Sequence, residues 1–297
     1  MKNKQQKADL MLLFITFTWG LSYLLTDIAL KEISPFYLNG LRFLIAFILI
    51  LIVGNKKLLN PSKTTIFYSI LLGCILFFVY LGATFGVKYT TLTNAGFLSC
   101  ITVILVPIFS HIFYKRPIAL RTWVLVIFAT FGIALMTLDE NFALKPETLK
   151  GDLFCLLCAA SYANHLLVTE KAVEQEDLDP FQLGTYQVLV CSLLNIGFSF
   201  YFENPIIPVE TPTILSIIFL SVFCTGIAFV IQPIAQQYTT ASHVGVIYTM
   251  EPVIAAGLAW AFAGEVMNTR NLIGAAILLA SLLIMEVGPT LRKRKTF

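Results

Sequence analysis

The feature that most constrains this chain is a series of long apolar stretches, most of them close to 20 residues, joined by short polar connections. A helix needs about 20 apolar residues to cross the hydrocarbon core of a bilayer. Because backbone groups left unpaired in lipid are costly, stretches of this length should be helices rather than strands. We therefore predict an all-α integral membrane protein with ten transmembrane helices, over residues 8–30, 35–53, 64–87, 93–114, 119–138, 151–172, 180–202, 213–237, 241–263 and 271–287.

Composition argues against a soluble globular protein. Hydrophobic residues make up 58% of the chain and charged residues only 12%, and a soluble domain of this size could not bury so much apolar surface. The six cysteines all fall inside predicted spans, which favours packing over disulfide formation. The short connections leave no room for a separate soluble domain.

The distribution of basic residues predicts the orientation. With the N-terminus inside, 14 Lys and Arg residues flank the inner ends of the spans and five flank the outer ends, while Arg42 lies within a span. Because positively charged loops are retained on the cytoplasmic side, both termini should be cytoplasmic, in a multi-pass protein of the cell (plasma or inner) membrane. The basic segment 292–295 is interpreted as a topology anchor, so no nucleic-acid partner is expected.

An internal repeat divides the chain into two halves. Asp9-Leu10 recurs as Asp152-Leu153, and Trp19 corresponds to Tyr162 at the same offset of 143 residues; Tyr89-Thr90-Thr91 recurs as Tyr238-Thr239-Thr240 at an offset of 149. We predict a first repeat at 1–138, a linker at 139–150 and a second repeat at 151–297 that includes the basic tail. Each repeat holds five spans, so the second copy enters the membrane from the opposite side. Inverted repeats of this kind are typical of secondary transporters, whose binding sites lie near the midplane.

Several motifs resemble those of the drug/metabolite transporter superfamily, EamA-type, and the resemblance covers nearly the whole chain. They are Trp19-Gly20, Arg42, the stretch 236–265 with its Met-Glu-Pro-Val-Ile-Ala-Ala segment and Gly264-Glu265, and Ile273-Gly274. Where the first repeat would be expected to carry Gly-Glu, this chain has Lys115-Arg116. The resemblance implies ten helices around a central cavity and a transporter, since the family includes exporters of amino acids, other metabolites and drugs.

Two ionisable residues at bilayer depth are candidates for binding a solute. Glu251 lies halfway along its span and directly before Pro252, which removes a backbone donor and can kink the helix. Glu251 could bind a cationic group or carry a proton, or it could hold two helices together as a neutral acid. Arg42 could attract a substrate carboxylate. Its structural alternatives are snorkelling to the interface or pairing with a carboxylate such as Asp27.

Aromatic residues near the same depth are the second group of candidates. Apolar rings with polar tips suit a cavity for moderately hydrophobic, partly polar solutes, although each ring could equally be packing. His165 follows Tyr162 by three residues on a similar helix face. The group consists of Trp19, Tyr23, Tyr80, Tyr162, His165 and Tyr248.

Motifs for other chemistries are absent from the sequence. It has no Gly-x-x-x-x-Gly-Lys segment for ATP, no His-Glu-x-x-His metal motif and no Gly-x-Ser-x-Gly nucleophile elbow. We therefore expect no enzyme, no catalytic residues, no cofactor and no bound metal. The predicted function is a secondary exporter of small organic metabolites, amino-acid-like or drug-like, that works by alternating access. Proton coupling, an uncoupled facilitator and a non-transporting assembly partner remain alternatives; a chain with both halves could act as a monomer.

Overall fold

The computed structural model describes residues 2–117, 120–138, 145–265 and 268–294, and this part of the chain is built from helices. In chain order these are α1 (Lys2–Leu30), α2 (Pro35–Gly54), η1 (Asn55–Leu58), α3 (Lys63–Tyr89), α4 (Leu92–Ser99), α5 (Thr102–Tyr114), α6 (Leu120–Thr137), α7 (Pro146–Ala172), α8 (Pro180–Phe202), α9 (Thr211–Ser221), the π-helical η2 (Val222–Ile227), α10 (Ala228–Gln236), α11 (Ala241–Ile247), η3 (Tyr248–Met250), α12 (Glu251–Phe262) and α13 (Thr269–Arg294).

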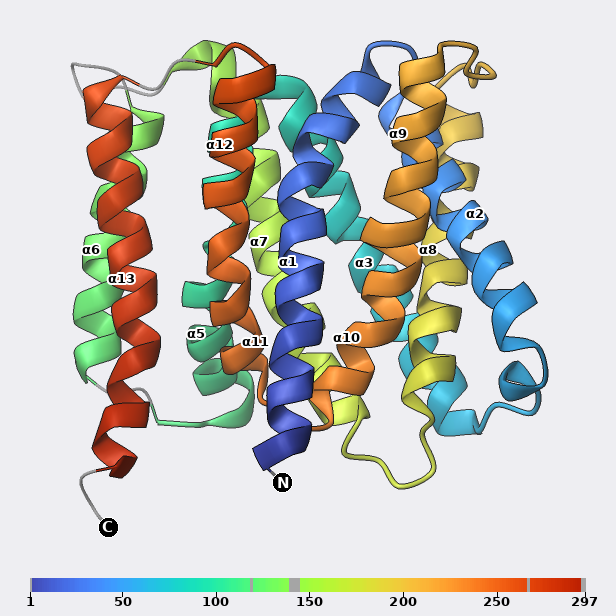
Figure 1. The fold of residues 1–297 in the computed structure, drawn as a ribbon, viewed down its shortest axis with the longest axis horizontal. Helices are drawn as coiled ribbons and strands as arrows, with labels where there is room; N and C mark the ends of the chain where they lie inside the picture. Colours follow the sequence, from blue (N-terminus) through green and yellow to red (C-terminus); the bar gives the residue numbers. More distant parts are fainter. Residues whose placement is uncertain (1, 118–119, 139–144, 266–267, 295–297) are drawn as a thin grey trace.

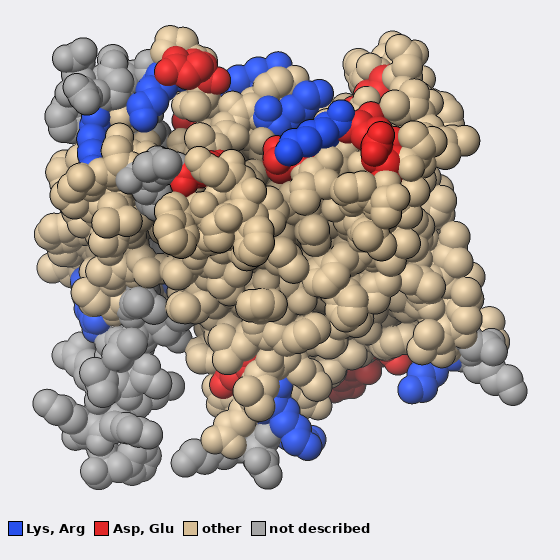
Figure 2. All heavy atoms as spheres, turned by 45° about the horizontal axis from the view of Figure 1, so that its top comes forward, with Lys and Arg blue, Asp and Glu red and all other residues tan. Residues whose placement is uncertain are grey.

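These helices form the predicted ten crossings. Eight helical segments are long and apolar enough to span a membrane, and the two shorter apolar segments Trp123–Met136 and Thr269–Ser281 lie within α6 and α13. The segments run roughly parallel to one another in a bundle, with α1, α9, α12 and α13 in front of α3, α6, α7 and α8 in the view of Figure 1. Charged side chains gather at the two ends of the face shown in Figure 2, with an uncharged band between them. The prediction of an all-α membrane fold is confirmed.

The packing follows the internal repeat. Helix α3 packs along α7, and the corresponding helices of the other half, α9 and α10, pack along α1. The remaining corresponding helices pack on each other, α2 on α8 and α6 on α13. The α3–α7 contact is close at Gly82, where an added Cβ would lie 2.5 Å from the backbone nitrogen of Cys158 and from the backbone oxygen of Phe154. Small residues allow such close approach of membrane helices.

Carboxylates join helices at the end of the bundle where α1 finishes, the upper end in Figure 1. Glu203, after α8, accepts hydrogen bonds of 3.0 Å from the backbone N–H groups of Phe36 and Tyr37 at the start of α2. Glu265, after α12, accepts from the N–H of Leu92 at 2.6 Å at the start of α4. Helix N-termini carry unpaired N–H groups and favour negative charge, so each carboxylate ties one helix to another.

Three predicted spans differ from the continuous helices expected. The fourth is interrupted between α4 and α5 at Cys100 and Ile101, and the ninth between α11 and α12 at η3. The eighth contains the π-helical segment η2. The interruption of the ninth has the cause expected from the sequence: Pro252 cannot donate to the carbonyl of Tyr248, four residues earlier.

Candidate functional site

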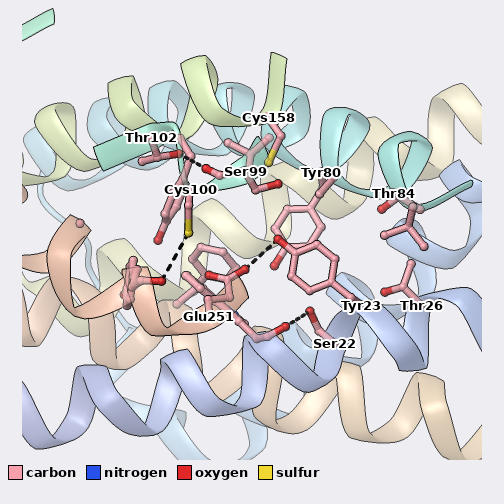
Figure 3. A pocket seen from close by; sticks show the side chains of 18 of the residues that line it. Ser22, Tyr23, Thr26, Tyr80, Thr84, Ser99, Cys100, Thr102, Cys158 and Glu251 are labelled. Atoms are coloured by element: carbon pink, nitrogen blue, oxygen red, sulfur yellow. Dashed lines mark hydrogen bonds between the residues drawn. The ribbon is translucent and has the colours of Figure 1, made fainter. Parts of the chain in front are cut away.

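A cavity of about 80 Å³ lies inside the bundle where the interrupted helices meet. Helix α1 contributes Trp19 to Thr26 and α3 contributes Val79 to Val87, both from their upper halves. Both interruptions also contribute to the lining: Ser99, Cys100 and Thr102 from the fourth span and Glu251 from the ninth are labelled in Figure 3, and Tyr248 of the ninth lines the cavity as well. The lining is mainly apolar and aromatic, with hydroxyl groups and two ionisable ends. Such a composition is typical of sites for small organic ligands.

The two interruptions touch each other at this cavity. The Cys100 thiol donates a weak hydrogen bond of 3.7 Å to the Tyr248 carbonyl, which also accepts from the backbone N–H of Glu251 in place of Pro252, a residue without an N–H. Thr102, at the start of α5, donates to the carbonyls of Ser99 at 2.8 Å and, on α7, of Ala159 at 3.1 Å. Polar side chains and a thiol therefore satisfy backbone groups that a continuous helix would have satisfied itself.

Glu251 provides the negative end of the cavity. It is the first residue of α12, where the N-terminal helix dipole favours a carboxylate. Its Oε1 accepts a hydrogen bond of 2.8 Å from the Tyr23 hydroxyl on α1 (Figure 3). No Lys or Arg forms an ion pair with Glu251 in the described part of the chain. The carboxyl group is therefore held by one neutral donor and faces the cavity.

Arg42 provides the positive end. It is 2% exposed, and its Nε donates to the Thr225 hydroxyl at 3.0 Å. Its guanidinium carbon lies 4.7 Å from the centre of the Tyr80 ring, and its buried Nη2 has no hydrogen-bond partner among the described residues. Arg42 is buried rather than exposed at a helix end, and Asp27, a carboxylate considered as its partner, pairs with Lys31 at 3.3 Å instead.

Trp19 lies at the centre of the aromatic lining. Its ring centre is 5.0 Å from that of Tyr248, 5.6 Å from Tyr162 and 5.6 Å from Phe229, within the range of favourable aromatic contacts. Its indole N–H donates to the carbonyl of Cys224, in η2, at 2.8 Å. Trp19 and Tyr162 occupy corresponding positions of the two repeats, and their rings are in contact in the cavity lining.

A chain of hydrogen bonds links α7 and α10 on the lower side of these rings. The Tyr162 hydroxyl donates to Gln232 at 3.1 Å, Gln232 donates to Gln236 at 3.0 Å, and Gln236 donates to the Leu166 carbonyl at 3.1 Å. All of these side chains are buried. Nearer the lower end, Asp9 on α1 pairs with His243 on α11 at 3.1 Å. These contacts join α1, α7, α10 and α11 on the lower side of the aromatic lining.

The structure brings seven of the eight residues proposed from the sequence together on this cavity: Trp19, Tyr23, Arg42, Tyr80, Tyr162, Tyr248 and Glu251. His165 is not among the lining residues. It is fully buried behind Tyr162, with ring centres 5.6 Å apart, and its Nε2 is 2.8 Å from the Gln187 side-chain oxygen.

Sequence reasoning missed the small polar residues of the lining, among them Ser22, Thr26, Ser99, Cys100 and Thr102. One signal was present. Cys100 corresponds to Thr249 at the repeat offset of 149, so the break expected before Pro252 had a counterpart in the fourth span. Within the described residues, no group of three or more His, Cys, Asp or Glu residues could hold a metal ion.

Comparisons with known proteins identify a family. The sequence matches the EamA-like transporter family over residues 6–138 and 149–287. A protein of Archaeoglobus fulgidus named "Uncharacterized transporter" is 28% identical over 285 residues, covering 96% of this chain and 87% of the relative. "Uncharacterized transporter YoaV" of Bacillus subtilis is 22% identical over 280 residues, covering 92% and 94%. A solved crystal structure shares the fold with a TM-score of 0.72 at 18% identity, covering 95% of this chain and 97% of its own.

Proposed function

Because the chain belongs to the EamA-like transporter family and is therefore a multi-pass membrane transporter of small molecules, we propose that it is a secondary exporter that works by alternating access. One observation carries the proposal: the interrupted fourth and ninth spans meet at the central cavity through Cys100 and Tyr248. Discontinuous helices at a repeat interface form the substrate sites of many secondary transporters. The cavity residues Trp19, Tyr162, Tyr248 and Glu251 would contact the solute.

The hydrogen bonds on the lower side of the aromatic lining support alternating access. The excess of Lys and Arg at the ends bearing both termini makes the lower end cytoplasmic by the positive-inside rule. The chain of hydrogen bonds from Tyr162 through Gln232 to Gln236 would then lie on the cytoplasmic side of the cavity. To load a solute from the cell, the two halves would rock so that this chain separates while the upper ends close. We place the protein in the cell membrane, working as a monomer, since one chain supplies both halves of the cavity.

The energy source has two candidates. Glu251 is a carboxyl group at the solute site with a neutral Tyr23 donor, an arrangement in which a proton could be exchanged for the solute. The alternative is movement down the solute gradient with no coupling ion. In proteoliposomes with an imposed pH gradient, only a coupled transporter accumulates solute above its external concentration. Glu251→Gln should abolish that accumulation; unchanged rate and pH dependence in this variant would exclude proton coupling through Glu251.

The first experiment is a resistance screen in cells that overproduce the protein, against toxic amino-acid analogues and cationic drugs. Trp19→Ala and Glu251→Gln are run in parallel, with membrane levels of each variant measured. Resistance to one chemical class that both variants lose supports export through the cavity. Full membrane levels without resistance to any compound would contradict the proposed export and favour an assembly role.

A further inference from the structure

We propose that an apolar groove between α2, α8 and the π-helical segment η2 binds one acyl chain of an anionic phospholipid, whose phosphate group pairs with Lys57 at the lower membrane surface in Figure 1. No residue that lines this groove also lines the solute cavity. The assignment goes beyond the proposed function, because this ligand comes from the bilayer and is not transported.

The groove follows the direction of the helices. Helix α2 contributes Ala46, Leu49, Ile50 and Val53, which share one helix face. These positions cover about 10 Å of the helix at about 1.5 Å per residue. Residues between Ser221 and Ile231, in η2 and the adjoining helices, form the facing wall. The volume of about 500 Å³ is therefore elongated, as an extended hydrocarbon chain requires.

Small residues open the groove at its upper end. Gly226 of η2 faces α2, and a Cβ added to it would lie 3.7 Å from the Cβ of Ala46. Ser221 is the only hydroxyl residue of the lining, and its hydroxyl donates to the Ile217 carbonyl on its own helix at 2.6 Å. The wall is thus wholly apolar. Single π-helical turns are rare and frequently lie at functional sites.

An apolar groove at this depth is filled from the bilayer. A water molecule needs two to four polar partners to occupy a cavity, and this wall supplies none. Leu49 is 39% exposed and Val53 is 86% exposed, so the groove opens on the side of α2 that faces lipid. Unfilled space would forfeit dispersion contacts along both walls, which an acyl chain supplies.

Lys57 lies where the groove reaches the lower membrane surface. The ring of Phe181, a lining residue, packs on the last residue of α2, since a Cβ added to Gly54 would lie 2.9 Å from its Cε1. The next residue, Gln182, donates to the Lys57 carbonyl at 2.9 Å. Lys57 is exposed and forms no ion pair with a described carboxylate. Lysine at this level attracts anionic headgroups.

Asp179 is the acidic residue closest in sequence to Phe181. Its Oδ1 accepts hydrogen bonds from the backbone N–H groups of Phe181 at 2.7 Å and Gln182 at 3.0 Å, so it caps the N-terminus of α8. The carboxylate is therefore held by the helix rather than by Lys57. The lysine charge remains available to a phosphate group, which selects an anionic phospholipid over a zwitterionic one.

The groove and the solute cavity lie on two sides of η2. Next to Gly226, Thr225 accepts from Arg42 at 3.0 Å, and Cys224 accepts from the Trp19 indole at 2.8 Å. An acyl chain in the groove would support η2 from the lipid side while these bonds hold it from the cavity side. Lipid binding should therefore stabilise the folded protein.

The test titrates the purified protein in detergent with dioleoyl phosphatidylglycerol and with dioleoyl phosphatidylcholine, which carry the same chains, and records the melting temperature. We expect the anionic lipid to reach half of its effect at a concentration at least fivefold lower. Native mass spectrometry should show one retained phosphatidylglycerol per chain. Glycerol 3-phosphate, which has the phosphate group without a chain, should not raise the melting temperature.

Variants assign the headgroup and the chain separately. Lys57→Gln should reduce phosphatidylglycerol to the level of phosphatidylcholine, and Lys57→Arg should keep the difference. Lys7→Gln removes a charge at the same end of the bundle, on α1, and should change nothing. Leu49→Trp fills the groove and should weaken binding of both lipids at least fivefold. Leu193→Trp, on the lipid-exposed side of α8 outside the groove, is its control.

Equal binding of the two lipids by the wild type would overturn the role of Lys57, and unchanged binding by Leu49→Trp would overturn the groove as the chain site. A response to glycerol 3-phosphate alone would show a phosphate site without a lipid. Each readout is lipid binding, so these outcomes do not depend on whether the protein exports its solute.

Discussion

The thiol of Cys100 lies 3.7 Å from the backbone carbonyl of Tyr248 and donates a hydrogen bond to it, so the break in the fourth span is joined to the break in the ninth. The two residues come from different repeats and meet beside the cavity. Pro252 has no N–H with which to close the α-helical bond to this carbonyl, which accepts instead from the Glu251 backbone N–H as well as from the thiol. The proline thus shapes the backbone beside the contact between the halves.

We predict that Pro252→Ala lowers the transport rate at least tenfold while the protein still folds. Alanine restores the N–H and has a helix propensity about 3 kcal/mol more favourable than proline, so α11 and α12 should become continuous. The new N–H would compete for the Tyr248 carbonyl with the Glu251 N–H and the Cys100 thiol, and Glu251 would turn relative to Tyr23. Transport in proteoliposomes and helical content by circular dichroism measure the two effects.

Pro212→Ala is the matched control, because Pro212 opens α9 after the extended residue Glu210, so no helical turn precedes it whose carbonyl an N–H at this position could reach. It should leave the transport rate within about twofold of the wild type, since no cavity residue lies in that turn. A Pro252→Ala variant that transports at the wild-type rate would show that the interrupted helix is not needed.

Gly82→Ala should destabilise the packing of α3 on α7. The added methyl group would lie 2.5 Å from the Cys158 nitrogen and the Phe154 oxygen, both backbone atoms that can move only with their helix. Overpacking of this kind costs about 1–3 kcal/mol. We expect a lower melting temperature in detergent and less protein in the membrane. Gly257→Ala is the control, because nothing lies within 4 Å of its added Cβ, and it should melt at or above the wild-type temperature.

Hydrophobicity and the repeat offsets predict the fold because the bilayer requires long apolar helices and duplication fixes their order. The break at Pro252 follows from a residue with a known backbone effect. The break at Cys100 cannot be predicted in this way, since neither Cys100 nor Ile101 disfavours a helix strongly. There, hydrogen bonds to carbonyls on α7 and in η3 determine where the helix is interrupted. Tertiary contacts override local propensity at this point.

Side-chain environments were the least accessible to sequence reasoning. Helical spacing places His165 on nearly the same face as Tyr162, but Gln187 on α8 binds its ring behind the lining. For Arg42 the sequence left substrate binding, snorkelling and pairing with a carboxylate open, and it did not indicate Thr225 of the π-helical segment or Tyr80 as its neighbours. Both outcomes depend on which helix lies opposite, and a single sequence does not contain that information.

Glu32→Gln should lower stability at neutral pH but not in acid. Glu32, after α1, accepts hydrogen bonds from the N–H of Val209 at 2.6 Å and of Glu210 at 3.2 Å. The Val209 N–H, with smaller contributions from the Thr213 side chain and Glu210, lowers the pKa of the Glu32 carboxyl group below its ordinary value of 4.5. A lowered folded-state pKa stabilises the protein above pH 4.5, and this stabilisation is lost as the pH falls through the folded-state value.

Melting temperatures from pH 7 down to pH 3 measure this effect. The wild type should melt above Glu32→Gln at neutral pH, and the two curves should converge in acid. Glu210→Gln, at the exposed neighbouring carboxylate, should show no such gap. A constant difference between wild type and Glu32→Gln over the whole range would mean that the carboxylate charge plays no part.

Trp19→Phe tests whether the indole N–H, rather than the ring, fixes the cavity wall. Phenylalanine keeps the aromatic contacts with Tyr162 and Tyr248 but leaves the Cys224 carbonyl without its donor, which lies 2.8 Å away in the wild type. Loss of one such hydrogen bond costs about 0.5–1.5 kcal/mol, whereas Trp19→Ala should cost about 3–5 kcal/mol because a cavity remains.

We therefore expect Trp19→Phe to melt only slightly below the wild type and to show a higher KM for the solute, because among the described residues η2 keeps only the hydrogen bond from the Cys224 thiol to the Thr18 carbonyl, 3.2 Å, to hold it against α1. Trp19→Ala should lose both stability and transport. Denaturation in detergent and initial transport rates separate the two contributions. Equal KM values for wild type and Trp19→Phe would show that the ring alone forms the wall and that its bond to η2 has no part in positioning the solute.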